Sequence, residues 1–168
     1  MTGVQTCALP ICDEYRMQEA LYKSEKKYKA VFENTGTATV IIEGDGTVSL
    51  ANNKFAEMAD NSLENIINKI KWPEYVVKDD HEKMWKQQHR LRREDRNKAL
   101  REYEFRFKDN SGRIKNIFAT IDMIPGTKKS VASLLDITEW KRVKKNLKER
   151  EEQLSTLLDA SPDIICFK

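Results

Sequence analysis

The sequence predicts an α+β fold, in which a five-stranded antiparallel sheet carries short helices on one face and is flanked by an N-terminal and a C-terminal helix. Segments with apolar residues at every second position, which is typical of strands, lie between two long charged segments with helical periodicity. Two tight-turn sequences, Gly44-Asp45-Gly46 and Asn110-Ser111-Gly112, join such segments into hairpins. The 168 residues, 39% of them hydrophobic, are enough to bury one core.

The composition excludes several classes of function. A net charge of +3 is too balanced to indicate a nucleic-acid or membrane-surface binder. No apolar run approaches the roughly 18 residues of a membrane span. The six glycines form neither of the common phosphate-binding loops. The three cysteines have no zinc-site spacing and favour a reducing compartment, so we expect a cytoplasmic location, with any membrane anchor elsewhere in the parent protein.

Residues 1–11, MTGVQTCALPI, are similar to the translation of a common sequencing adapter read from a GTG start codon. They have neither the basic region nor the continuous apolar region of a signal peptide. We therefore expect them to be an artefact and leave them out of the fold. The chain also stops within an apolar run, and we expect it to be a fragment of a longer protein.

The first predicted helix, residues 12–34, has a counterpart at the other end of the chain. Residues 21–32 are similar to residues 147–158, at an offset of 126 residues or 18 heptads, so both helices share one heptad frame. The frame gives Glu14, Met17, Leu21, Ser24, Tyr28 and Val31 in the first helix, and Trp140, Val143, Leu147, Arg150, Leu154 and Leu157 in the last. We expect a homodimer through these flanking helices, although an amphipathic helix packed on its own domain fits the same pattern.

The first half of the sheet follows the first helix. Residues 37–43 are rich in β-formers, and residues 47–51 alternate after the glycine turn, which predicts a hairpin. Asn52 then opens a short helix with Phe55 and Met58 at helical spacing. Asn61 or Ser62 can cap a second short helix.

A longer helix is predicted from residue 79 to about residue 95, with its less charged stripe at His81, Met84/Trp85, Gln88 and Leu91. Three strands follow, at residues 103–107, 113–124 and 130–137, separated by polar and glycine-containing turns. Asp136 or Thr138 can cap the exit helix, and Glu139 suits its positive end.

Together these motifs resemble the PAS (Per-Arnt-Sim) sensory domain, over about residues 13–168. The resemblance rests on Asp45-Gly46-Thr47 with Asn52-Asn53-Lys54-Phe55, on Asn110-Ser111-Gly112-Arg113, and on Asp136-Ile137-Thr138-Glu139. It implies a PAS domain at residues 35–137, an exit helix at 138–158, and the start of a second such domain at 159–168. Family members with this tandem spacing are typically sensor histidine kinases, and sometimes cyclic-dinucleotide cyclases. A sensory or relay role is therefore implied, with downstream PAS or kinase domains as partners.

We find no catalytic constellation and expect this fragment not to be an enzyme. The sequence His81-Glu82-Lys83-Met84 is only superficially similar to a phospho-acceptor box, because the rest of that box is missing. The helical region has no cysteine, which excludes the photoreactive flavin–cysteine chemistry of some family members.

His81 and a set of apolar residues are the candidate ligand contacts. In haem-binding members a histidine on the corresponding helix ligates the iron, which makes a haem gas sensor the alternative; a half-buried or capping histidine among acidic neighbours is the simpler interpretation. The ligand is unknown, and we predict no bound cofactor and no metal. A cavity for a small molecule could be lined by Trp72, Met84, Phe105, Ile117, Phe118 and Ile121, which could equally be plain core.

The signal is expected to leave the domain where the last strand becomes the exit helix. The candidate relay residues are Asp136, Ile137, Thr138, Trp140 and Arg150. The basic residues between Arg90 and Arg101 are interleaved with acids, as on a solvated helix end, so no nucleic-acid partner is expected. A ligand-free dimerisation spacer is the remaining alternative.

Overall fold

The computed structural model describes residues 10–85 and 100–159, which form one antiparallel sheet with helices before, within and after it. The strands are β1 (Ala38–Ile42), β2 (Val48–Ala51), β3 (Glu102–Lys108), β4 (Ile114–Met123) and β5 (Ser130–Asp136). Their order in the sheet is β2-β1-β5-β4-β3, with every neighbouring pair antiparallel. The predicted α+β class and five-stranded antiparallel sheet are confirmed.

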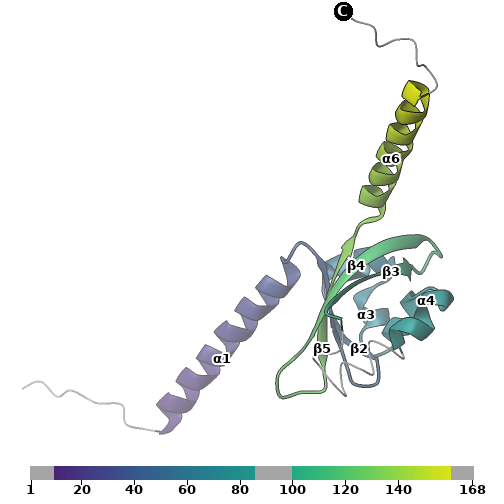
Figure 1. Ribbon diagram of the computed structural model, residues 1–168. Coiled ribbons are helices and arrows are strands. Elements are labelled where there is room, and N and C mark those ends of the chain that lie inside the picture. The colour runs from purple at the N-terminus through teal and green to yellow at the C-terminus, as the bar shows by residue number, and fades with distance from the viewer. Residues whose placement is uncertain (1–9, 86–99, 160–168) are drawn as a thin grey trace, which may run out of the picture.

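Two long helices extend away from the sheet, and the short ones cover one of its faces (Figure 1). The long helices are α1 (Pro10–Glu33) and α6 (Thr138–Asp159); the short elements are α2 (Asn53–Ala59), α3 (Leu63–Ile66), the 3-10 helix η1 (Trp72–Tyr75) and α4 (Lys78–Lys83). Helix α1 begins at Pro10, inside the adapter-like segment. Of the helix predicted at 79–95, the structure describes α4 and a following π-type turn at Met84 and Trp85; residues 86–95 lie outside the described residues.

The core lies between the sheet and the short helices. Alternate residues of each strand point into it, as the two-residue period requires. Helices α2 and α3 and the segment from η1 to Met84 supply the facing layer. The buried side chains include Val40, Val48, Phe105, Phe107, Ile117 and Ile121 on the strands, and Phe55, Ile66, Tyr75 and Met84 opposite them.

Both long helices join the same end of the sheet. Strands β1 and β5 are antiparallel neighbours, with Ala38 at the start of β1 paired to Leu134 near the end of β5. The chain therefore enters β1 from α1 close to the point where it leaves β5 for α6 (Figure 1). None of the helices in the described ranges is long and apolar enough to cross a membrane.

The edge strand β3 is covered by the start of α4. The backbone N–H of Val77 donates to the Arg106 carbonyl at 3.1 Å, and Val76 forms a bridge with Phe107. The Asp80 carboxylate accepts from the Arg106 backbone N–H and from its guanidinium, at 2.9–3.0 Å. This pairing raises the pKa of the Arg106 guanidinium. Because the free polar groups of an edge strand invite pairing with another chain, these contacts also protect the sheet.

Candidate functional site

A small apolar cavity lies between the sheet and the short helices. Its volume is about 40 Å³. Four of the predicted residues, Trp72, Met84, Phe105 and Ile121, line it. The other lining residues are Val40, Ile42, Val48, Phe55, Tyr75, Val76, Tyr103, Phe107, Ser130, Ala132 and Leu134.

The two remaining predicted residues lie elsewhere. Ile117 is fully buried in the core but does not line the cavity. Phe118 is half-buried and points to the opposite face of the sheet, because it stands between the inward residues Ile117 and Ala119. The two-residue period of β4 was the signal that could have separated Phe118 from its neighbours.

The cavity wall is aromatic and carries no charged side chain among its described lining residues. The rings of Tyr75 and Phe107 stack with centroids 5.1 Å apart, and Phe55 meets both of them edge-on. Burial raises the pKa of the Tyr75 hydroxyl, so this group stays neutral at physiological pH. The surroundings suit a neutral and largely apolar molecule.

The size of the cavity restricts what it can hold. A site for one water needs about 10–15 Å³, whereas a site for benzene is about 150 Å³. At about 40 Å³, the cavity suits a molecule of very few atoms.

Haem does not fit this arrangement. The cavity is far too small for a porphyrin, and His81, half-buried on α4, is not among the lining residues. The described residues contain no group of three or more side chains placed to hold a metal ion. Gln88, Leu91 and the basic residues from Arg90 to Lys98 lie outside the described residues.

Behind one lining residue of the cavity, Trp72, lie a second tryptophan and a glycine. Trp72 packs against Trp85 with ring centroids 5.9 Å apart. Gly46, in the β1–β2 turn with φ +91°, lies under this pair. A Cβ at position 46 would stand 2.8 Å from Cζ3 of Trp85 and 3.4 Å from Nε1 of Trp72. The turn sequence predicted the positive φ, but it could not reveal what packs against the glycine.

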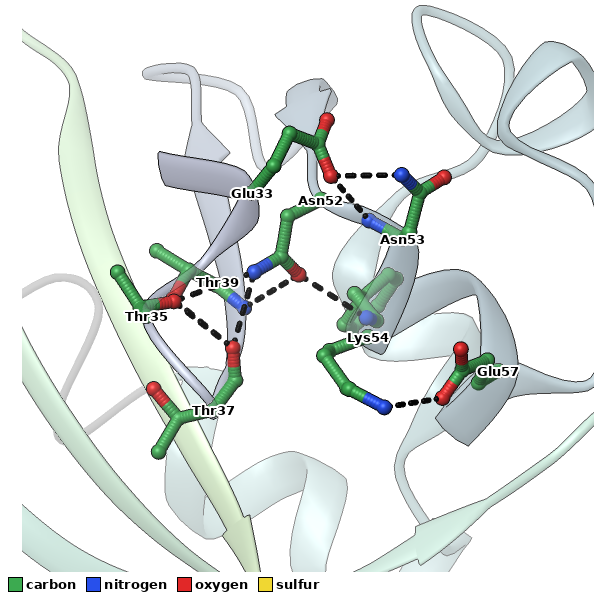
Figure 2. A network of polar contacts seen from close by, with 9 residues as sticks. Glu33, Thr35, Thr37, Thr39, Asn52, Asn53, Lys54 and Glu57 are labelled. Carbon is green, nitrogen blue, oxygen red and sulfur yellow. Dashed lines mark hydrogen bonds and ion pairs between the residues drawn. The ribbon is translucent and has the colours of Figure 1, made fainter. Parts of the chain in front are cut away.

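Asn52 is the centre of a buried polar network at the start of α2 (Figure 2). Its side chain is fully buried. The amide oxygen accepts from the backbone N–H groups of Thr39 at 2.9 Å and of Phe55 at 3.0 Å. The amide nitrogen donates to the carbonyls of Thr37 at 2.9 Å and of Phe32 at 3.1 Å. Asn52 therefore caps α2 and also joins it to β1 and to the end of α1.

The next residue makes a second connection to α1. The Glu33 carboxylate accepts from the backbone N–H of Asn53 at 3.0 Å and from its side-chain amide at 2.8 Å (Figure 2). Elsewhere α1 is largely exposed: from residue 13 to its end, no side chain is buried. These polar contacts therefore fix the last turn of α1 to the domain.

Three of the predicted relay residues lie at the start of α6: Asp136, Ile137 and Thr138. The Asp136 carboxylate accepts from the Thr138 N–H at 2.9 Å, which caps the helix. On β4, the Asn116 N–H donates to the Thr138 hydroxyl at 2.8 Å, and the Asn116 carbonyl accepts from the Ile137 N–H at 2.9 Å. Asn116 is a contact that the sequence did not indicate.

One ion pair extends this junction into α6. Lys141 pairs with Glu104 of β3 at 2.5 Å. Trp140 and Arg150 are exposed, and the Lys144 ammonium of the same helix lies 4.7 Å from the centre of the Trp140 ring. The structure thus brings together the first three predicted relay residues, and it leaves Trp140 and Arg150 on the solvent side of the helix.

Comparison with known proteins gives one consistent result. Residues 26–96 match the family model of the PAS domain. A PAS domain of an HTR-like protein from Haloarcula marismortui is similar, with TM-score 0.57 and 16% identity over 73% of this chain and 99% of that one. A search of curated proteins found no match.

Two further solved structures are similar to this chain. The PAS domain of a Colwellia psychrerythraea protein has TM-score 0.59 and 19% identity, over 68% of this chain and 97% of that one. A sensory box histidine kinase/response regulator from Burkholderia thailandensis has TM-score 0.57 and 15% identity, over 77% of this chain and 98% of that one. At these identities the structural matches establish the fold.

Proposed function

We propose, from the match of residues 26–96 to the PAS domain family, that the chain is a relay module that passes a conformational signal from its sheet domain to α6. The observation that carries the proposal is the way α6 is attached. Its polar contacts with the sheet lie between Ile137 and Lys141, and the described helix has no buried residue. The sheet therefore determines the direction of the first turn, and the first turn determines the rest of the helix.

The parent protein is proposed to be a sensor histidine kinase, with this chain in its cytoplasmic input region. The support is that several similar structures are described as domains of such kinases. Residues 159–168 would begin a second PAS domain, and the exposed stripes of α1 and α6 would pair with those of a second copy. The fragment itself would transmit and not catalyse.

Amide hydrogen exchange in two variants tests the relay. Thr138→Val removes the hydroxyl that accepts from Asn116, and Asp136→Ala removes the cap. Exchange at Ile137 and Lys141 should accelerate about fivefold in each, because one cap is worth about 1 kcal/mol. Ile121 lies on the same strand as Asn116, and its N–H donates to the carbonyl of Arg101, which directly precedes β3. Exchange at Ile121 should change little.

Thr127→Val is the matched control, because Thr127 lies in the exposed β4–β5 turn. It should leave exchange at Ile137 unchanged. Equal acceleration at Ile121 and Ile137 in the Thr138 and Asp136 variants would mean that the whole sheet opens with the junction, and the proposed relay would then be lost.

The small volume of the cavity favours a signal molecule of very few atoms over a larger ligand. Xenon is a suitable probe, and methyl shifts of Met84 and Ile121 should respond to it, whereas a ligand-free dimerisation spacer would show no saturable response. The haem alternative predicts a Soret band that His81→Ala abolishes after reconstitution; we expect no such band.

A further inference from the structure

Helix α2 is fixed at both of its ends, although it has only seven residues. At its start, Asn52 and Asn53 hold the last turn of α1, as described above. At its end, the Ala59 carbonyl accepts from the Asn110 N–H at 2.9 Å, and the Met58 carbonyl accepts from the Lys115 ammonium at 2.7 Å. A cation suits this position, because the last carbonyls of a helix carry partial negative charge.

The Lys115 ammonium is itself held in place. It lies 3.5 Å from the carboxylate of Asp109, whose side chain is fully buried. Asp109 also accepts from the Arg113 backbone and guanidinium, each at 2.9 Å. The Arg113 guanidinium reaches Asp60, the residue that ends α2, at 3.3 Å. The β3–β4 hairpin and the end of α2 are therefore joined by a network of charges.

Two consecutive residues of β4 connect this network to α6. Lys115 binds the end of α2, and the backbone of Asn116 binds Ile137 and Thr138. The contacts run without interruption from the last turn of α1, through α2, to the first turn of α6. Phe55, in the middle of α2, also forms part of the cavity wall.

We propose that α2 is a rigid link that couples the position of α1 to that of α6, with Lys115 as its essential positioning residue. The proposal rests on the relay proposed above and specifies its route. A displacement of the α1 end would move α2 along its axis, and Lys115 would pass this displacement to Asn116. The competing route runs directly along the paired strands β1 and β5 and bypasses Lys115.

A mutant cycle separates the two routes in the full chain. Glu33→Ala releases α1 from Asn53, and Lys115→Met removes the ammonium while keeping most of the length of the side chain. Exchange of the Ile137 amide, divided by that of the Ile121 amide, reports the junction independently of global unfolding. Glu33→Ala should accelerate this normalised exchange about two- to thirtyfold, which is the range by which mutations along a coupled network change the coupling. In the Lys115→Met background the same substitution should have no effect.

Two control variants match the chemistry of the cycle. Glu19→Ala removes a carboxylate of α1 that pairs with Lys23 of the same helix, and Lys54→Met removes a lysine of α2 that pairs with Glu57 on the surface. Neither should alter the ratio. If Lys115→Met fails to fold, Lys115→Gln replaces it.

The outcomes distinguish failure of the route from failure of the function. If Glu33→Ala still accelerates the normalised exchange of Ile137 in the Lys115→Met background, the coupling runs through β1 and β5, and the proposal is overturned. No effect of Glu33→Ala in either background overturns it as well. In both cases the Thr138→Val and Asp136→Ala experiment still decides whether the junction controls α6.

Discussion

At the scale of single residues, Gly46 shows most directly how the backbone and the cavity depend on one another. Its φ of +91° is one that L side chains rarely adopt, and its α-carbon faces Trp85. Gly126 has a similar φ of +74°, but a Cβ there would have no atom within 4 Å. The two positions therefore separate the cost of the backbone conformation from the cost of the close contact.

Gly126→Ala should lower the free energy of unfolding by about 1 kcal/mol, the cost of placing an L side chain in the left-handed region. Gly46→Ala should cost about 1–3 kcal/mol more, because the new methyl group must displace Trp85. Urea denaturation measures both values, and tryptophan fluorescence should shift in Gly46→Ala alone. Equal losses of stability would show that Trp85 moves aside freely and is not held against Gly46.

Asn52 marks a limit of what the sequence predicts at this scale. Its place before Phe55 predicts the helix cap, because a cap bonds three residues ahead. The bonds to Thr39 and Phe32 span 13 and 20 residues of sequence, and no local pattern encodes them. They exist because the fold brings the end of α1, the start of β1 and the start of α2 together.

At the scale of elements, α6 carries an exposed apolar stripe that its own domain does not cover. Trp140, Val143, Leu147, Leu154 and Leu157 are each more than half exposed, at 57–66%. Arg150 interrupts this stripe and is exposed as well. The stripe is the one that the heptad frame predicts, and its pairing with a second copy stays a prediction.

Arg150→Leu should strengthen self-association of the chain, because it removes the charge from the stripe. The dimer dissociation constant should fall about tenfold or more, since burial of a leucine contributes about 1.5–3 kcal/mol. Sedimentation equilibrium measures it. Arg142→Leu, which lies off the stripe and beside Glu139, is the control and should change the constant little. A chain that stays equally monomeric in Arg150→Leu would reduce the stripe to a solvated helix face.

At the scale of the whole molecule, the Asp109 network makes stability depend on pH. Burial would raise the pKa of the Asp109 carboxyl, but the hydrogen bonds and positive charges of Arg113 and Lys115 outweigh it, so the pKa lies below its usual value. A carboxyl with a lower pKa in the folded state stabilises the protein above its unfolded pKa. This contribution is lost as the pH falls through the folded pKa.

Asp109→Asn should therefore be less stable than the wild type at pH 7, and the difference should shrink as the pH falls below about 4. Urea denaturation between pH 7 and pH 2 measures it. Arg113→Met should show the same convergence, because it removes the main partner of Asp109. Unfolding curves that stay equally separated down to pH 2 would contradict the assignment.

The architecture could be predicted from the sequence because periodicity and turn residues report it directly. The strands, their hairpins and the start of the exit helix all follow from local patterns. The cavity was only partly predictable: Trp72 and Met84 were named from their apolar character, whereas Phe55 and Tyr75 come from elements whose packing depends on the whole fold. Lys115 and Asn116 could not be found, because their partners lie 57 and 22 residues away.

The attachment of α6 by one turn has a mechanical consequence. The 22-residue helix is about 33 Å long at 1.5 Å per residue, so it acts as a lever with its pivot at Ile137 and Thr138. A tilt of about 10° at the pivot, which needs only a fraction of an ångström of movement in the Asn116 contacts, would carry the far end through about 6 Å. A displacement too small to disturb the packed sheet would thus move Asp159 by about the width of a side chain.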